Sequence, residues 1–144
     1  MTRTSPALTF LPTIAAALLL IGCLGAWVSI DAGPISESVA GTETDDGKLL
    51  IGFSIVLIVG TLLAARRWMW IVLAVVAFLA LVIAVVDIAD VGSESQEFFG
   101  ESIGYSAGWG LWLCVLAAAV CLGASVWRAV RSPQRTLGAR PAAA

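Results

Sequence analysis

Histidine is absent from this 144-residue sequence, and charged side chains make up only 12 % of it. Without histidine the chain has no imidazole base, no histidine metal ligand and no histidine to hold haem iron. Soluble domains carry about 25 % charged residues, so the shortage of charge argues against an ordinary soluble enzyme. The formal net charge of -2 gives no electrostatic reason to expect a nucleic-acid partner.

Hydrophobic residues, by contrast, make up 60 % of the chain, and its mean hydropathy is +0.98. Four long stretches contain no charged residue at all, namely 4–30, 49–65, 68–86 and 102–127. Each is near or above the roughly 20 residues that cross a bilayer core of about 30 Å. Backbone amides in hydrocarbon must be paired within the segment, which favours helices. We therefore expect an all-α polytopic membrane protein, a four-helix transmembrane bundle with spans at about 10–30, 48–65, 69–86 and 107–127.

The two signs of charge fall on opposite sides of this four-span arrangement. Every arginine lies before the first span, between the second and third, or after the fourth: Arg3, Arg66, Arg67, Arg128, Arg131, Arg135 and Arg140. All ten acidic residues lie in the other two connections, 31–47 and 87–106, together with Lys48 at the edge of the second span. Basic connections stay in the cytoplasm, so we expect a plasma (inner) membrane protein with both termini cytoplasmic. Residues 1–9 form its cytoplasmic head and 128–144 a basic, disordered tail, flanking the transmembrane domain 10–127.

Tryptophans and small residues add two expectations about packing. The six tryptophans lie near predicted span ends, as in an interfacial belt: Trp27, Trp68, Trp70, Trp109, Trp112 and Trp127. Small residues spaced four apart, such as Gly22 with Ala26 and Ala119 with Gly123, predict close helix contacts. A weak similarity between 31–38 and 90–95 also allows two parallel helical-hairpin repeats.

The acidic connections supply the candidate binding residues. Hard cations prefer several oxygen ligands, so Asp45 and Asp46 before the second span, and Asp87 and Asp90 after the third, are candidate cation ligands. The same carboxylates also suit a basic extracytoplasmic partner, or simply a solvated acidic surface, which we favour. We recognise no set of nucleophile and base, no metal-ligand spacing and no cofactor motif, so we predict no catalytic residue, no resident metal and no cofactor.

The three cysteines, Cys23, Cys114 and Cys121, all lie inside predicted spans. Cys114 and Cys121 are two turns apart on one span, too far to bridge. Cys23 and Cys114 are expected at a similar depth in the membrane. Two interpretations are therefore open: the two cysteines form a disulfide between the first and fourth spans, or they pack as small apolar residues. The segment 20–23 also resembles a bacterial lipobox, which makes Cys23 a candidate for lipidation. The apolar stretch continues to Ile30, however, and favours an uncleaved span.

Three features resemble small four-span membrane proteins of actinobacteria: Trp27 at the end of the first span, Asp45-Asp46-Gly47 before the second, and the segment 104–112, GYSAGWGLW, opening the fourth. The resemblance implies a topology and no catalytic residues. We therefore expect a non-catalytic accessory, scaffold or interaction subunit with acidic extracytoplasmic loops. Its partners would be the lipid bilayer and either other membrane proteins or further copies in a homo-oligomer. The alternative is an oligomeric channel or transporter for a small solute or an ion.

Overall fold

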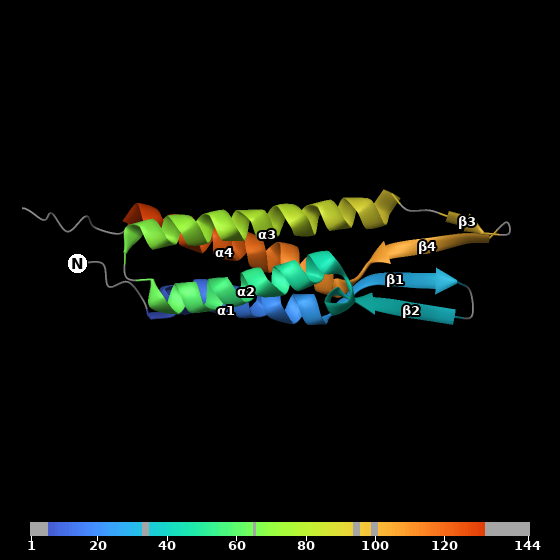
Figure 1. Ribbon diagram of the computed structural model, residues 1–144, viewed down its shortest axis with the longest axis horizontal. Coiled ribbons are helices and arrows are strands. Elements are labelled where there is room, and N and C mark those ends of the chain that lie inside the picture. The colour runs from blue at the N-terminus through green and yellow to red at the C-terminus, as the bar shows by residue number, and fades with distance from the viewer. Residues whose placement is uncertain (1–5, 33–34, 65, 94–95, 99–100, 132–144) are drawn as a thin grey trace, which may run out of the picture.

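The computed structural model describes residues 6–32, 35–64, 66–93, 96–98 and 101–131. Four helices lie side by side along the long axis of the molecule, and a four-stranded sheet extends from one end of them (Figure 1). The helices are α1 (Pro6–Leu24), α2 (Asp45–Leu63), α3 (Arg67–Ser93) and α4 (Trp109–Arg131). We call the end that carries the strands the sheet end, and the opposite end, where α2 connects to α3, the turn end.

The helices have the length and the exterior of membrane-embedded segments. α2, α3 and α4 are each long and apolar enough to cross a membrane, and α1 contributes the shorter apolar segment Phe10–Leu24. Large hydrophobic side chains such as Leu62, Phe78 and Leu116 are exposed on the outer faces of the helices. A soluble bundle would put charged and polar groups on those faces. The apolar exterior therefore indicates a protein embedded in a membrane.

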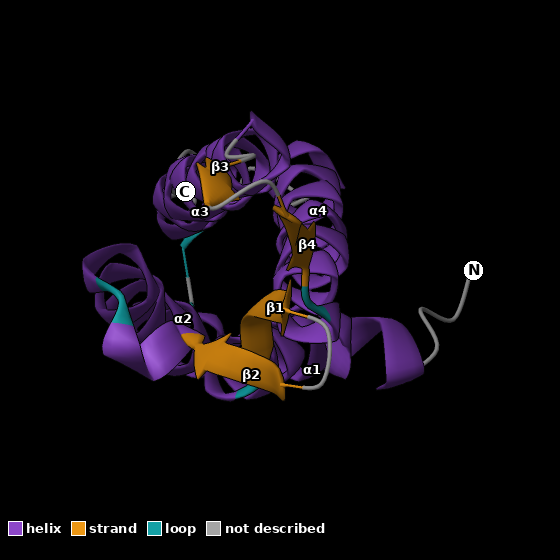
Figure 2. Cartoon of the chain, turned by 90° about the vertical axis from the view of Figure 1, so that its right-hand side faces the viewer, coloured by secondary structure: helices purple, strands orange, loops and turns teal. Residues whose placement is uncertain are grey.

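Helix α4 is the central packing partner of the bundle, because it contacts both α1 and α3 extensively. Helix α2 packs on the other side of α1 and meets α3 less closely (Figure 2). The buried side of α4 consists mainly of small residues: Gly110, Cys114, Ala117, Ala118, Cys121, Ser125 and Ala129. Small side chains let helix backbones approach where no hydrophobic effect drives association in lipid.

Glycines mark the closest approach of α1 to α4. A Cβ added to Gly22 would lie 2.7 Å from Cys114 Sγ and 2.9 Å from the carbonyl oxygen of Gly110. The prediction of a close contact at Gly22 is confirmed. At Gly123 it is wrong, because a Cβ there would meet nothing within 4 Å.

The sheet joins the two halves of the chain. Its strands are β1 (Ala26–Ala32), β2 (Ile35–Ala40), β3 (Gln96–Phe98) and β4 (Glu101–Ala107), in the order β2-β1-β4-β3. All three strand pairs are antiparallel, and β1 pairs with β4 from Val28 opposite Ala107 to Asp31 opposite Gly104. Strands β2 and β3 form the two edges. Seen from the sheet end, the strands follow a curve over the ends of the helices (Figure 2).

The strands correct the expectation of an all-α chain. The two acidic connections were expected as loops, yet most of their described residues lie in strands, in the 3-10 turn Gly41–Glu43 or in helix ends. The first helix ends at Leu24 rather than Ile30, because Val28-Ser29-Ile30-Asp31 alternates apolar and polar residues and pairs as a strand. Helix α3 continues to Ser93, beyond the expected end at 86. Helix α4 includes Arg128 and Arg131, which were expected in the tail; residues 132–144 lie outside the described part.

The expected internal repeat is matched in the order of elements but not in the residues that suggested it. Each half of the chain reads helix, strand, strand, helix. However, Asp31 lies in β1, whereas Asp90 lies within α3. The similarity between 31–38 and 90–95 therefore does not align equivalent places in the two halves.

The two ends of the bundle carry opposite charge among the residues that the structure describes. Arg66 and Arg67 lie at the turn end with Arg128 and Arg131, while the described acidic residues belong to segments at or beyond the sheet end (Figure 1). The expected segregation of charge by sign thus follows from the packed fold as well as from the order of the chain.

Two of the six tryptophans depart from the expected interfacial belt. Trp68, Trp109, Trp112 and Trp127 are exposed near helix ends, as a belt requires. Trp27 and Trp70 are only 3 % and 5 % exposed. The indole Nε1 of Trp27 donates to the carbonyl oxygen of Gly22 at 3.2 Å, which satisfies its buried N–H. For Trp27 and Trp70 the belt prediction is wrong, and both belong to the core.

Candidate functional site

A pocket of about 200 Å³ opens at the sheet end, where α2 begins and α3 leaves the bundle. Three of the four predicted cation ligands line it, namely Asp46 from α2 and Asp87 and Asp90 from α3. The remaining lining residues are Trp27, Val28, Thr44, Val91 and Leu111. The structure thus brings together carboxylates that are more than forty positions apart in the sequence, against a mostly apolar wall.

The turn before α2 places Asp46 at this pocket. Thr44 caps the helix, because its Oγ1 accepts from the backbone N–H of Gly47 at 3.1 Å and donates to the carbonyl of Gly41 at 3.0 Å. A side chain on Gly47 would collide with the carbonyl of Gly41. The turn is therefore tight, and it requires glycine at position 47.

Asp45, the fourth predicted ligand, does not line the pocket. Its side chain is 99 % exposed, and its Oδ1 accepts from Lys48 Nζ at 2.9 Å. In an exposed ion pair of this kind, water and the partner side chain both solvate the charge, so the pair contributes little to stability. The structure therefore separates Asp45 from the other three candidates.

Asp87 has the most unusual environment of the pocket carboxylates. It lies on α3, near the end of the apolar segment Arg67–Val91 that is long enough to cross a membrane. Its Oδ2 is buried without a hydrogen-bond partner among the described residues. Asp46 and Asp90 line the same pocket, so the negative charge there is concentrated around a half-buried carboxylate.

The chemistry available at this pocket is limited. Within the described ranges, no group of three or more His, Cys, Asp or Glu side chains is arranged to hold a metal ion. Thr44 brings a hydroxyl group to the wall, but its Oγ1 accepts from the backbone N–H of Gly47 and donates to the carbonyl of Gly41. The carboxylates supply negative charge, and cation binding by Asp46, Asp87 and Asp90 stays a prediction.

Two cysteines lie next to each other inside the bundle, toward the sheet end. Cys23 Sγ of α1 and Cys114 Sγ of α4 are 3.8 Å apart, and both residues are completely buried. The expectation that they share a depth is confirmed. Cys121 is buried as well, but its Sγ faces the carbonyl of Pro12 at 3.7 Å. Lipidation of Cys23 stays a prediction, and the structure places that sulfur between helices rather than at a surface.

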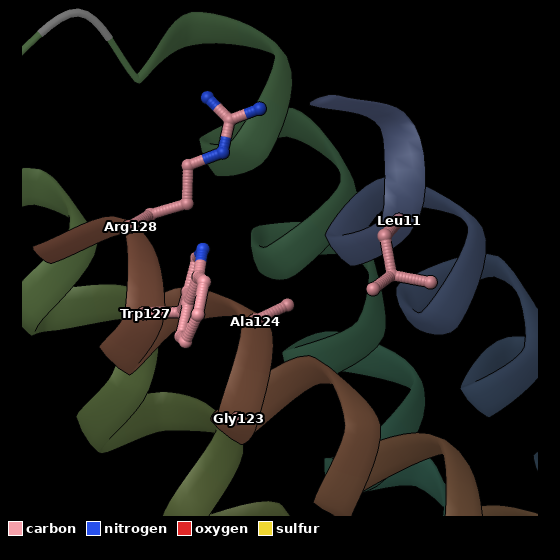
Figure 3. Close-up of a pocket in the computed structure, with 5 residues that line it drawn as sticks. All are labelled: Leu11, Gly123, Ala124, Trp127 and Arg128. Carbon is pink, nitrogen blue, oxygen red and sulfur yellow. The ribbon is translucent and has the colours of Figure 1, made fainter. Parts of the chain in front are cut away.

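A second pocket, of about 290 Å³, lies at the turn end between α1 and α4 (Figure 3). Leu11 faces it from α1, and Gly123, Ala124, Trp127 and Arg128 line it from α4. The guanidinium of Arg128 stacks over the ring of Trp70 at 4.9 Å. An apolar hollow next to a guanidinium is a shape that suits a lipid chain below its headgroup. Sequence reasoning missed this pocket, because its lining comes from two helices, and Leu11 and Gly123 lie more than 100 positions apart in the sequence.

Comparisons with family models, with curated proteins and with solved structures give no significant match to this chain.

Proposed function

We propose that this chain is a non-catalytic membrane subunit, an accessory or scaffold protein that uses its sheet to bind a partner protein outside the cell membrane. The observation that carries the proposal is the sheet itself. Both acidic connections fold into it, and it extends beyond the helix ends (Figure 1). A membrane anchor alone does not need an ordered sheet outside the bilayer.

The edge of the sheet supports a binding role. Strand β2 pairs with β1 on one side only, so its other side presents backbone N–H and C=O groups that an extended segment can pair with. Glu37 and Ser38 on this strand are exposed, and Glu43 is exposed close by. The carboxylates favour a partner segment that carries Lys or Arg, because opposite charges steer association.

The composition of the bundle interior favours a transmembrane region that anchors the protein and does not conduct ions or protons. Among the described residues, the buried polar ones are Ser54, Thr61 and Ser125, while Asp87 at the sheet end of α3 is half-buried. Ser54 and Thr61 donate to carbonyls of their own helix. Ion pathways and proton relays usually place ionisable groups within the membrane. A partner-binding role requires none, and it agrees with the predicted orientation, in which the arginine-rich turn end faces the cytoplasm.

Site-specific photo-crosslinking in intact cells tests the proposal. A photoreactive residue at Ser38 on the β2 edge is expected to give a defined protein adduct. The same residue at Leu62 on the exposed face of α2 is the matched control and is expected to give none. The double variant Glu37→Lys, Glu43→Lys should weaken recovery of that adduct at least several-fold.

A chain that gives no adduct from Ser38, and is isolated in mild detergent without any other protein, contradicts the proposal. Flux of small solutes through liposomes that contain the purified chain also contradicts it. That result would favour the alternative, an oligomeric channel or transporter.

A further inference from the structure

The contact between Cys23 and Cys114 is placed at the junction that holds the two halves of the chain together. Cys23 lies one turn before β1 begins, and Cys114 lies in the second turn of α4, which follows β4. At the same junction the backbone N–H of Gly108 donates to the carbonyl of Trp27 at 2.6 Å. The two sulfurs therefore lie directly beneath the strand pair β1–β4.

The surrounding helix contacts hold the thiols of Cys23 and Cys114 next to each other. Gly22 and Gly110 bring α1 and α4 so close that a methyl group on either would meet backbone atoms of the other helix. The Cys114 thiol lies 3.7 Å from the carbonyl of Leu19, one turn before Cys23. A disulfide requires the sulfurs to close from 3.8 Å to about 2.05 Å, a movement within reach of side-chain rotation.

We propose that Cys23 and Cys114 form a disulfide that links α1 to α4 and locks the junction beneath the sheet. The two thiols lose two protons and two electrons as the S–S bond forms, and the oxidant is a disulfide that is itself reduced to two thiols by exchange. Exchange takes place while α1 and α4 are still packing together, because both sulfurs are completely buried once they have packed. The pair lies in the half of the bundle that the proposed orientation turns toward the oxidising exterior.

The test uses the full chain, reduced and unfolded in a denaturing detergent and then returned to mild detergent in the presence of diamide, a small oxidant that accepts the two hydrogens. The thiols thus meet the oxidant while α1 and α4 pack together. The intact mass is expected to fall by two hydrogen atoms, with one of the three thiols left for alkylation after denaturation. Trypsin should release residues 4–48 joined to 68–128, and a further cut between Cys114 and Cys121 should leave the link on Cys114. The oxidised chain should also unfold at a higher temperature than the reduced chain.

Cys121 supplies the matched control, because it is a buried cysteine of the same helix whose sulfur faces a carbonyl instead of a thiol. Cys121→Ser should keep both the loss of mass and the thermal shift, whereas Cys23→Ser and Cys114→Ser should lose both. Three free thiols after diamide treatment, a link through Cys121, or a link between two chains would overturn the proposal. So would a mature chain that carries a lipid on Cys23. The wild-type peptide map decides the question even if a serine variant does not fold, and none of these results depends on whether the sheet binds a partner.

Discussion

Replacing Gly22 by alanine tests the packing of α1 against α4 at its tightest point. The new methyl group would lie 2.7 Å from Cys114 Sγ, 2.9 Å from the carbonyl oxygen of Gly110 and 3.0 Å from the backbone nitrogen of Cys114. Two of these three atoms belong to backbone and cannot rotate away, so the helices must separate. Overpacking of this kind costs about 1–3 kcal/mol.

Gly123→Ala is the matched control, because Gly123 lies on α4 with nothing within 4 Å of an added Cβ. In a helix, alanine is favoured over glycine by up to about 1 kcal/mol, so this variant should be neutral or slightly stabilised. Both glycines lie within helices, so the helix-propensity gain is shared, and Gly22→Ala should unfold more easily than Gly123→Ala by the overpacking cost of about 1–3 kcal/mol. Denaturant titration in mild detergent, followed by far-ultraviolet circular dichroism, measures the difference. Equal stability, or a more stable Gly22→Ala, would refute the close contact between α1 and α4.

Two further predictions concern the sheet end. Trp27→Phe removes the indole bond to Gly22 and should lower the free energy of unfolding by about 1–2 kcal/mol. Thr44→Ala removes the cap on Gly47 and should cost about 1 kcal/mol, measured in the same denaturant titration.

The four helices could be predicted because four long uncharged stretches mark where they lie. Their limits could not, since α1 ends before its stretch does and α3 and α4 continue past the flanking charges. The sheet was missed although its local signal is present, since Val28-Ser29-Ile30-Asp31 alternates as strands do. That segment directly follows an apolar helix, and the uncharged stretch 4–30 includes both. A prediction based on uncharged stretches therefore assigns Val28 and Ile30 to the membrane span. The pairing of β1 with β4 joins positions about 75 residues apart, and no local pattern specifies it.

The sequence predicted that aspartates form the candidate site, but it did not predict which of the four aspartates line the pocket. The sequence singled out four aspartates by charge alone, and the turn at Gly47 directs Asp46 to the pocket while Asp45 pairs with Lys48. A shared depth of Cys23 and Cys114 was expected from their equal distance to the predicted span ends, but their contact, at 3.8 Å between the sulfurs, depends on how α1 and α4 pack. The burial of Trp27 was not, because an indole at a span end usually lies at the lipid headgroups.

Labelling of single cysteines in intact cells tests most directly whether the sheet and the arginine-rich turn lie on opposite sides of the membrane. Ser38 on β2 and Arg66 at the turn end are both exposed, while the three native cysteines are buried and serve as the blank. A membrane-impermeant maleimide should label Ser38→Cys in whole cells and Arg66→Cys only after lysis. Labelling of Arg66→Cys from outside, or of both positions from the same side, would contradict the proposed topology.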